Sequence, residues 1–239
     1  LERVAPVGVN LTHAIVAPAR RAVLTAPVEI ERRRQGQGIV TATFRLLDSA
    51  DLSGISGAAI YIAIDASFSM SGAPMNGAIA AVRAMVADLG LTVPPTAKND
   101  ICILTWHEAV GDMILRRDAD TDDFVDLVTW LSVPVILAGA TDFGVAVSEA
   151  EAFFAGVGAK RRVILFITDG EPYPASSVDT AIITLGGISD VEVFGFNIGL
   201  ADISFTALLD NTPDDGVPVI SPGDTDTLLS SLRKAFTGL

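Results

Sequence analysis

Cysteine and histidine are almost missing from this sequence, which contains one cysteine and two histidines. The single cysteine, Cys102, excludes an intrachain disulfide, and its place in the apolar run Ile101–Leu104 indicates a buried structural thiol. No stretch approaches the roughly 20 uninterrupted apolar residues of a transmembrane helix, so we expect no membrane insertion. The sequence does not identify a cellular compartment.

Basic residues are also scarce. The chain has 16 Lys and Arg against 29 Asp and Glu, which gives a net charge of -13 and a pI near 4.4. A nucleic-acid partner is therefore not expected, because the phosphate backbone would be repelled. The hydrophobic content of 50% is ample for a sizeable core within 239 residues.

The common enzyme fingerprints are missing as well. There is no Gly-x-Gly-x-x-Gly, no Walker A sequence and no Gly-x-Ser-x-Gly nucleophile elbow. An aspartyl-nucleophile phosphotransferase would need a second Asp where Ser67 stands. We expect His107 to be a hairpin-turn residue away from the central strand, which leaves Ser67 and Ser69 without a base. The sequence thus predicts a protein that is not an enzyme.

Residues 1–57 differ from residues 58–239 in charge. The first segment has seven Arg and five acidic residues, a net of +2, so the second carries -15. Within the first segment we predict strands at 23–30 and 39–47, joined by a hairpin loop at 34–38. Two interpretations of this extension stay open: an irregular arm across the main domain, or an arm that docks onto a neighbouring subunit.

In residues 58–239, apolar strand patterns alternate with helical ones, which predicts an α/β fold. We expect a doubly wound, mostly parallel, Rossmann-like sheet with helices on both faces. The segment 110–116 is expected to add one antiparallel edge strand. The other predicted strands are 58–64, 100–106, 162–168, 191–198 and 217–220, and the predicted helices are 74–89, 121–131, one ending at 154, 203–209 and 225–236.

Polar residues follow three of these predicted strands or loops. Asp65, Ser67 and Ser69 come directly after the first buried strand, Thr141 lies in a glycine-bearing loop, and Asp169 follows a later apolar strand. Because the carboxyl ends of parallel strands share one edge, we expect these side chains to converge. Hard oxygen donors suit Mg²⁺, Mn²⁺ or Ca²⁺ rather than zinc. Taken alone, Asp-x-Ser-x-Ser is also typical of a capped turn.

These ordered segments resemble the von Willebrand factor type A family and its metal-ion-dependent adhesion site. The similar segments are Asp-Ala-Ser-Phe-Ser-Met-Ser-Gly from Asp65, Gly-Ala-Thr-Asp from Gly139, and Thr-Asp-Gly-Glu-Pro from Thr168. The resemblance covers about 58–239. It implies that Ser67, Ser69 and Thr141 donate oxygens directly to a metal, with Asp65 and Asp169 acting directly or through water.

Three neighbouring residues qualify the resemblance. Phe68 stands where many members of the family carry a small residue, and its ring either covers the metal and ligand surface or packs beside the loop. Asp142 is expected to cap the following helix rather than to bind metal. Glu171 either closes the open coordination position or is a solvated turn carboxylate.

The resemblance implies a protein-interaction or adhesion module. Only two carboxylates would balance the cation, so an open coordination position would capture an acidic side chain of a partner protein. The alternative is a structural subunit of a large assembly, such as a virion, tail or appendage. In that case residues 1–57 would make the subunit contacts.

Overall fold

The structure is a computed structural model. It describes residues 28–34, 37–44, 57–92, 98–158, 160–170, 172–199, 209 and 219–237, the first two segments as backbone only. The chain divides into two compact units, Leu1–Ala50 and Asp51–Leu239. In the first unit, β1 (Val28–Arg34) pairs antiparallel with β2 (Gln37–Phe44). The prediction of a loop from residue 34 was too long, because Arg34 still pairs with Gln37.

The second unit contains a six-stranded sheet in the order β5-β4-β3-β6-β7-β8. All neighbouring strands are parallel except β4 and β5, which confirms the predicted sheet with one antiparallel edge strand. The strands are β3 (Ala58–Asp65), β4 (Asn99–Trp106), β5 (Val110–Ala119), β6 (Arg161–Thr168), β7 (Val191–Ile198) and β8 (Val219–Ile220).

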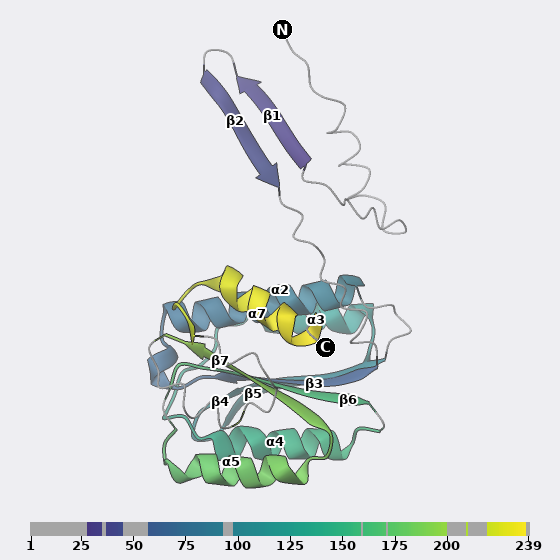
Figure 1. Ribbon diagram of the computed structural model, residues 1–239, viewed down its shortest axis with the longest axis vertical. Coiled ribbons are helices and arrows are strands. Elements are labelled where there is room, and N and C mark those ends of the chain that lie inside the picture. The colour runs from purple at the N-terminus through teal and green to yellow at the C-terminus, as the bar shows by residue number, and fades with distance from the viewer. Residues whose placement is uncertain are drawn as a thin grey trace. The chain divides into compact units, whose positions relative to one another are not determined.

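Helices cover both faces of this sheet (Figure 1). On one face lie α2 (Ala73–Thr92), α3 (Thr121–Trp130) and α7 (Thr225–Thr237). On the other lie α4 (Phe143–Ala155) and α5 (Ser176–Gly187). This arrangement is the doubly wound α/β fold that the alternating pattern predicts.

Two helices differ from the predictions. The sequence pattern did not predict α5, which provides the crossover between β6 and β7. The prediction that α2 ends near Gly90 was wrong, because the helix continues to Thr92. A side chain at Gly90 would place its Cβ 2.8 Å from Cβ of Phe124, so this glycine permits close packing of α2 against α3. The predicted helix at 203–209 lies outside the described residues except for its last position.

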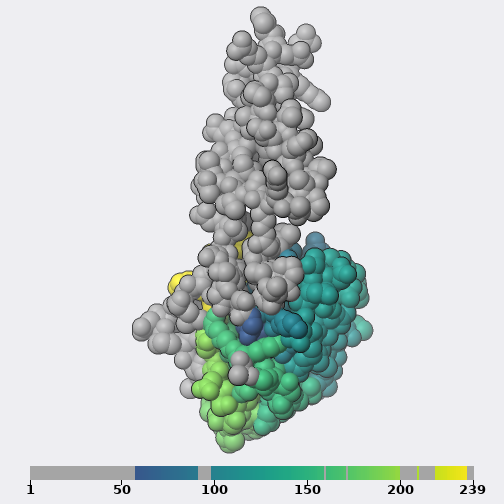
Figure 2. All heavy atoms as spheres, turned by 90° about the vertical axis from the view of Figure 1, so that its right-hand side faces the viewer, coloured from purple at the N-terminus to yellow at the C-terminus, as the bar shows by residue number. Residues whose placement is uncertain are grey.

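The core lies on both sides of the central strands. Every residue of β3 and β4 is buried, as expected for strands that are covered on two faces. On the side of α4 an aromatic cluster includes Trp106, Phe143 and Phe166, with ring centroids 5.9 to 6.1 Å apart. Cys102 is buried in the same cluster, as predicted. Figure 2 shows one face of the molecule, to which the teal and green middle of the chain contributes most of the coloured surface.

Among the described helices, none combines the length and the apolar character needed to cross a membrane.

Candidate metal centre

The candidate site lies where the strand order reverses. The chain passes from β3 to its neighbour β4 and later returns to β6 on the opposite side of β3. The loops after β3 and β6 therefore meet at the carboxyl edge of the sheet, where doubly wound folds form their ligand crevice. The loop from Ala138 to Asp142 joins them, since Ala138 N donates to Ala66 O at 2.9 Å and Thr141 forms a bridge with Pro172.

Asp65 is the inner carboxylate of the site and is completely buried. Its Oδ1 accepts a hydrogen bond from Ser67 N at 2.8 Å. Its Oδ2 accepts from Thr141 Oγ1 at 2.9 Å and from Thr168 Oγ1 at 2.5 Å. Burial raises the pKa of this carboxyl group, although the hydrogen bonds from Thr168, Ser67 and Thr141 oppose the rise. The side chain is thus held in one orientation at a cost in desolvation.

Asp169 is the outer carboxylate and is only partly buried. Ser69 Oγ donates to Asp169 Oδ1 at 2.8 Å, and Ser69 Oγ lies 3.0 Å from Ser67 Oγ. Desolvation raises the pKa of Asp169, and the nearby charge of Asp65 raises it further. The two carboxylates therefore interact unfavourably when both are ionised.

Gly170 allows the two halves of the site to approach each other. A Cβ at this position would lie 2.6 Å from Thr141 Oγ1 and 3.3 Å from Asp65 Oδ2. Its amide donates to Thr168 Oγ1 at 3.1 Å. A residue without a side chain is needed here because the hydroxyl of Thr141 occupies that space.

The donor set fits a hard divalent cation. Two carboxylates and three hydroxyls converge, and all of them are oxygen donors of the kind that Mg²⁺, Mn²⁺ and Ca²⁺ prefer. Among the described residues, no Lys or Arg forms an ion pair with Asp65 or Asp169, so this part of the chain does not balance their charge. The described part of the chain contains no cluster of three or more His, Cys, Asp or Glu arranged to hold a metal. Hydroxyls would have to complete the coordination.

The structure places all five candidate residues in one hydrogen-bonded network, which consists of Asp65, Ser67, Ser69, Thr141 and Asp169. Ser67 and Thr141 are buried and Ser69 is exposed, so the network runs from the sheet edge to the surface.

The neighbouring residues have separate roles. Phe68 is 66% exposed, so most of its surface faces solvent beside the candidate site. Asp142 caps α4 as predicted, since its Oδ1 accepts from Gly144 N at 2.8 Å. Glu171 lies outside the described residues.

Two residues near the site differ from expectation. The sequence did not indicate a role for Thr168, which ends an otherwise apolar strand and donates directly to Asp65. The prediction that His107 lies away from the central strand was wrong, because β4 is the immediate neighbour of β3. The backbone of His107 accepts a hydrogen bond from Asp142 N at 3.2 Å. Within the described part of the chain, no hydrogen bond joins His107 to Ser67 or Ser69, and its Nδ1 has no partner.

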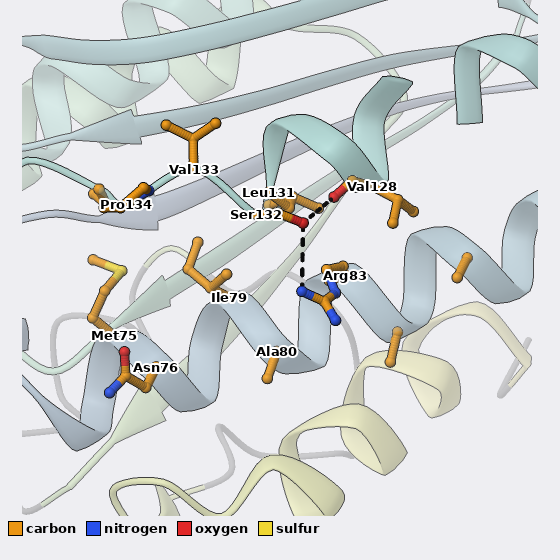
Figure 3. A pocket seen from close by; sticks show the side chains of 13 residues that line it. Met75, Asn76, Ile79, Ala80, Arg83, Val128, Leu131, Ser132, Val133 and Pro134 are labelled. Carbon is orange, nitrogen blue, oxygen red and sulfur yellow. Dashed lines mark hydrogen bonds between the residues drawn. The ribbon is translucent and has the colours of Figure 1, made fainter. Parts of the chain in front are cut away.

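A cavity of about 720 Å³ lies apart from this network, between α2 and the end of α3 (Figure 3). Its walls are mainly apolar, with Arg83 and Ser132 facing each other at 3.4 Å. It contains none of the five candidate residues. The candidate metal centre therefore lies outside this cavity.

Comparison with known proteins shows the fold. No family model and no curated protein matches the sequence. A von Willebrand factor type A protein from Catenulispora acidiphila matches at 18% identity and a TM-score of 0.59, over 76% of this chain and 42% of that one. Conserved hypothetical protein BatB from Bacteroides thetaiotaomicron matches at 14% identity and a TM-score of 0.57, over 76% of this chain and 98% of that one.

Two further solved structures are similar to this chain. Proximal thread matrix protein 1 from the mussel byssus, with a zinc-occupied metal-ion-dependent adhesion motif, matches at 14% identity and a TM-score of 0.61, over 77% of this chain and 46% of that one. The pilus adhesin SpaC from Lactobacillus rhamnosus GG matches at 14% identity and a TM-score of 0.59, over 77% of this chain and 31% of that one. This chain spans less than half of three of these four proteins. Its second unit has the von Willebrand factor type A fold.

Proposed function

We propose that this chain is a protein-interaction module that binds a divalent cation at the carboxyl edge of its sheet and captures a carboxylate of a partner protein. The observation that carries the proposal is the charge of the site. Two desolvated carboxylates share one network with three hydroxyls, and no described Lys or Arg neutralises them. A cation relieves this imbalance directly.

Each residue of the network has a definable role. Ser67, Ser69 and Thr141 donate oxygen lone pairs to the metal. The hydroxyl hydrogens of Ser69 and Thr141 point to Asp169 and Asp65. Asp65 and Asp169 supply the balancing charge, directly or through water. Thr168 is a positioning residue, because its hydroxyl fixes Asp65 Oδ2. When bound, the cation supplies an electrophilic position that attracts an external carboxylate.

The module is proposed to be non-enzymatic. The hydroxyls of Ser69 and Thr141 donate to carboxylates rather than to a histidine. A Ser-His-Asp arrangement requires a base within hydrogen-bond reach of the nucleophile, and the network does not provide one. Binding is the activity that its geometry supports.

Mg²⁺ is the proposed occupant, with Mn²⁺ and Ca²⁺ as alternatives. The hard oxygen donors favour these ions over softer metals. The similar mussel protein is described with zinc in its adhesion motif, so Zn²⁺ belongs in any comparison of affinities. Competition among the four ions measures the preference.

The proposed capture of a carboxylate has a direct test. Protein loaded with Mn²⁺ should enhance the relaxation of water protons, because the open position carries exchangeable water. Addition of N-acetyl-aspartate methylamide should displace that water and lower the enhancement. The neutral analogue N-acetyl-asparagine methylamide is the matched control and should have no effect. Equal effects of the two analogues would refute carboxylate capture.

A second candidate function is a structural role in a large assembly, in which residues 1–57 make contacts between subunits. Two proteins of similar fold are a pilus adhesin and a thread matrix protein, which supports this alternative. The opposite charges of residues 1–57 and 58–239 also favour contacts between copies. Light scattering on the full chain and on a chain that starts near Ser53 tests it. If both the full chain and the shortened chain are monomers, the assembly role is contradicted.

A further inference from the structure

The strand β5 forms one edge of the six-stranded sheet, and within the described part of the chain it pairs only with β4. Among these residues, the other long side of β5 therefore carries backbone donors and acceptors that no strand uses. Nine of its ten residues are exposed or partly exposed, whereas every residue of β4 is buried. An open edge of this length is a surface to which another strand can add.

The backbone of Asp112 identifies which residues face the open edge. Its N–H donates to Thr105 Oγ1 at 2.9 Å, and its carbonyl accepts from the same hydroxyl at 3.3 Å, so both groups face β4. Backbone groups alternate in direction along a strand, so those of Met113 and Leu115 face away from β4. The carbonyl of Leu115 accepts from the Arg116 side chain at 3.0 Å, where the backbone of a neighbouring strand could donate instead.

The same two residues expose apolar side chains. Met113 is 49% exposed and Leu115 is 39% exposed. Side chains alternate between the faces of a sheet, so both lie on the face of Arg117, whose guanidinium contacts Phe153 of α4. Charged residues or proline usually protect an open edge, but these two positions are apolar. Free backbone groups and exposed apolar side chains therefore coincide at the middle of the edge.

The segment from Asp112 to Arg116 matches itself when two copies pair antiparallel. With Ile114 opposite Ile114 of a second copy, Met113 of each chain lies opposite Leu115 of the other. Asp112 lies opposite Arg116, so no like charges face each other directly in this segment. Every apolar residue of the segment thus meets an apolar residue.

The neighbouring registers fit less well. A shift that centres the pairing on Leu115 brings Asp112 opposite Asp118, and like charges directly opposite each other are destabilising. A shift that centres it on Met113 brings Asp112 opposite Ile114. The register centred on Ile114 is therefore the preferred one.

We propose that β5 is a self-association edge, through which two copies of this chain pair antiparallel about a two-fold axis at Ile114. Met113 and Leu115 form hydrogen-bonded pairs in this arrangement, and two such pairs supply four backbone hydrogen bonds. The occupant is a second copy because the sequence of the edge matches its own reverse. The contact uses the same surface on both chains, so it closes at two copies.

This pairing uses none of the five metal-centre residues and does not involve residues 1–57. The two sheets run in opposite directions across the axis, so the carboxyl edges of their parallel strands face opposite ways. A dimer would therefore present two metal centres that point apart and could link two partner proteins. Only this last consequence rests on the proposed function.

Sedimentation equilibrium of the full chain in a chelating buffer tests the pairing without the metal. We expect a reversible monomer–dimer equilibrium with a dissociation constant of the order of 100 μM, because the edge contact is small and the net charge of -13 opposes association. Higher salt should strengthen the dimer, since it screens this repulsion. A parent chain that stays monomeric up to about 1 mM would overturn the proposal.

Met113→Lys locates the contact. The lysine introduces a charge opposite the partner's Leu115 and should weaken association by about tenfold or more. Val125→Lys is the matched control, because Val125 is 61% exposed on α3 and the change in charge is the same. It should associate as the parent chain does. Equal association of Met113→Lys and the parent would place the contact elsewhere and refute the proposal.

Ile114→Cys tests the axis. In a cross-strand pair that is not hydrogen-bonded, the Cα atoms lie about 4.5 Å apart, which a disulfide can span. Mild oxidation should therefore give a covalent dimer on a non-reducing gel, whereas the control Val125→Cys should stay monomeric. The native Cys102 is buried and should not cross-link. Failure of Ile114→Cys to link, or equal linking of the control, would overturn the assigned axis.

Discussion

The substitution Gly170→Ala tests the geometry of the metal centre most sharply. The added methyl group would lie 2.6 Å from Thr141 Oγ1, whereas ordinary contact begins at 3.4 Å. Either the loop after β6 or the Thr141 side chain must therefore move by about 0.8 Å. Positive φ is not involved at this position, so the effect is steric.

A displacement of this size matters for a small cation. Mg²⁺ requires oxygen ligands near ~2.1 Å in close to octahedral geometry, and a ligand moved by about 0.8 Å no longer coordinates it. We expect Mg²⁺ affinity to fall about 10-fold to 100-fold. The Thr141 to Asp65 hydrogen bond would also weaken, which should lower the free energy of unfolding by about 1–3 kcal/mol.

The assays are calorimetric titration with Mg²⁺ and urea denaturation of the metal-free protein. Gly158→Ala is the matched control, because no atom lies within 4 Å of its added Cβ and its φ is not positive. It should leave both quantities unchanged. Unchanged Mg²⁺ affinity in folded Gly170→Ala would refute the role of Thr141 as a metal ligand.

Thr168→Val removes the hydroxyl that donates to Asp65, and should lower the free energy of unfolding in urea by about 1–3 kcal/mol, whereas Thr168→Ser should retain it. Burial raises the pKa of Asp65 and Asp169, so calorimetry should show weaker Mg²⁺ binding as pH falls toward about 4, because protons compete with the metal. The stability of the metal-free protein, measured in chelator, should depend on pH in the opposite direction. Above the ordinary pKa of about 4, the folded state binds more protons than the unfolded state does. The free energy of unfolding should therefore fall as pH rises through the raised pKa values of the two carboxyl groups. Gly90→Ala should destabilise the fold by about 1–3 kcal/mol, because the added methyl group clashes with Phe124. This loss is larger than the gain from the higher helix propensity of alanine. Mg²⁺ affinity should stay unchanged, and a higher urea midpoint would contradict the prediction.

The sheet and the candidate site at its carboxyl edge were predictable because local sequence patterns determine them. An uninterrupted apolar run gives a doubly covered strand, and polar residues directly after such strands lie at one sheet edge. The motif from Asp65 and the segments around Thr141 and Asp169 therefore locate the candidate site from the sequence alone.

Other features depend on contacts between distant residues. The helix α5 was missed because exposed Ile183 weakens its amphipathic pattern. The role of Gly90 follows from the position of Phe124 on another helix, which no local rule describes. In the sequence, Thr168 is one more residue of a strand pattern. Its role depends on its hydrogen bond to Asp65, which is distant in the chain. The position of His107 depends on strand order, which local periodicity does not determine.

The most direct test of the proposed cation site is a calorimetric titration of chelator-stripped protein with Mg²⁺, beside the Asp169→Asn variant. The asparagine keeps the size of Asp169 and can still accept the hydrogen bond from Ser69, but it removes one balancing charge. The account predicts saturable binding by the parent chain and binding weaker by about tenfold or more in the variant. If a folded parent chain binds none of Mg²⁺, Mn²⁺, Ca²⁺ and Zn²⁺, the cation-dependent account is contradicted.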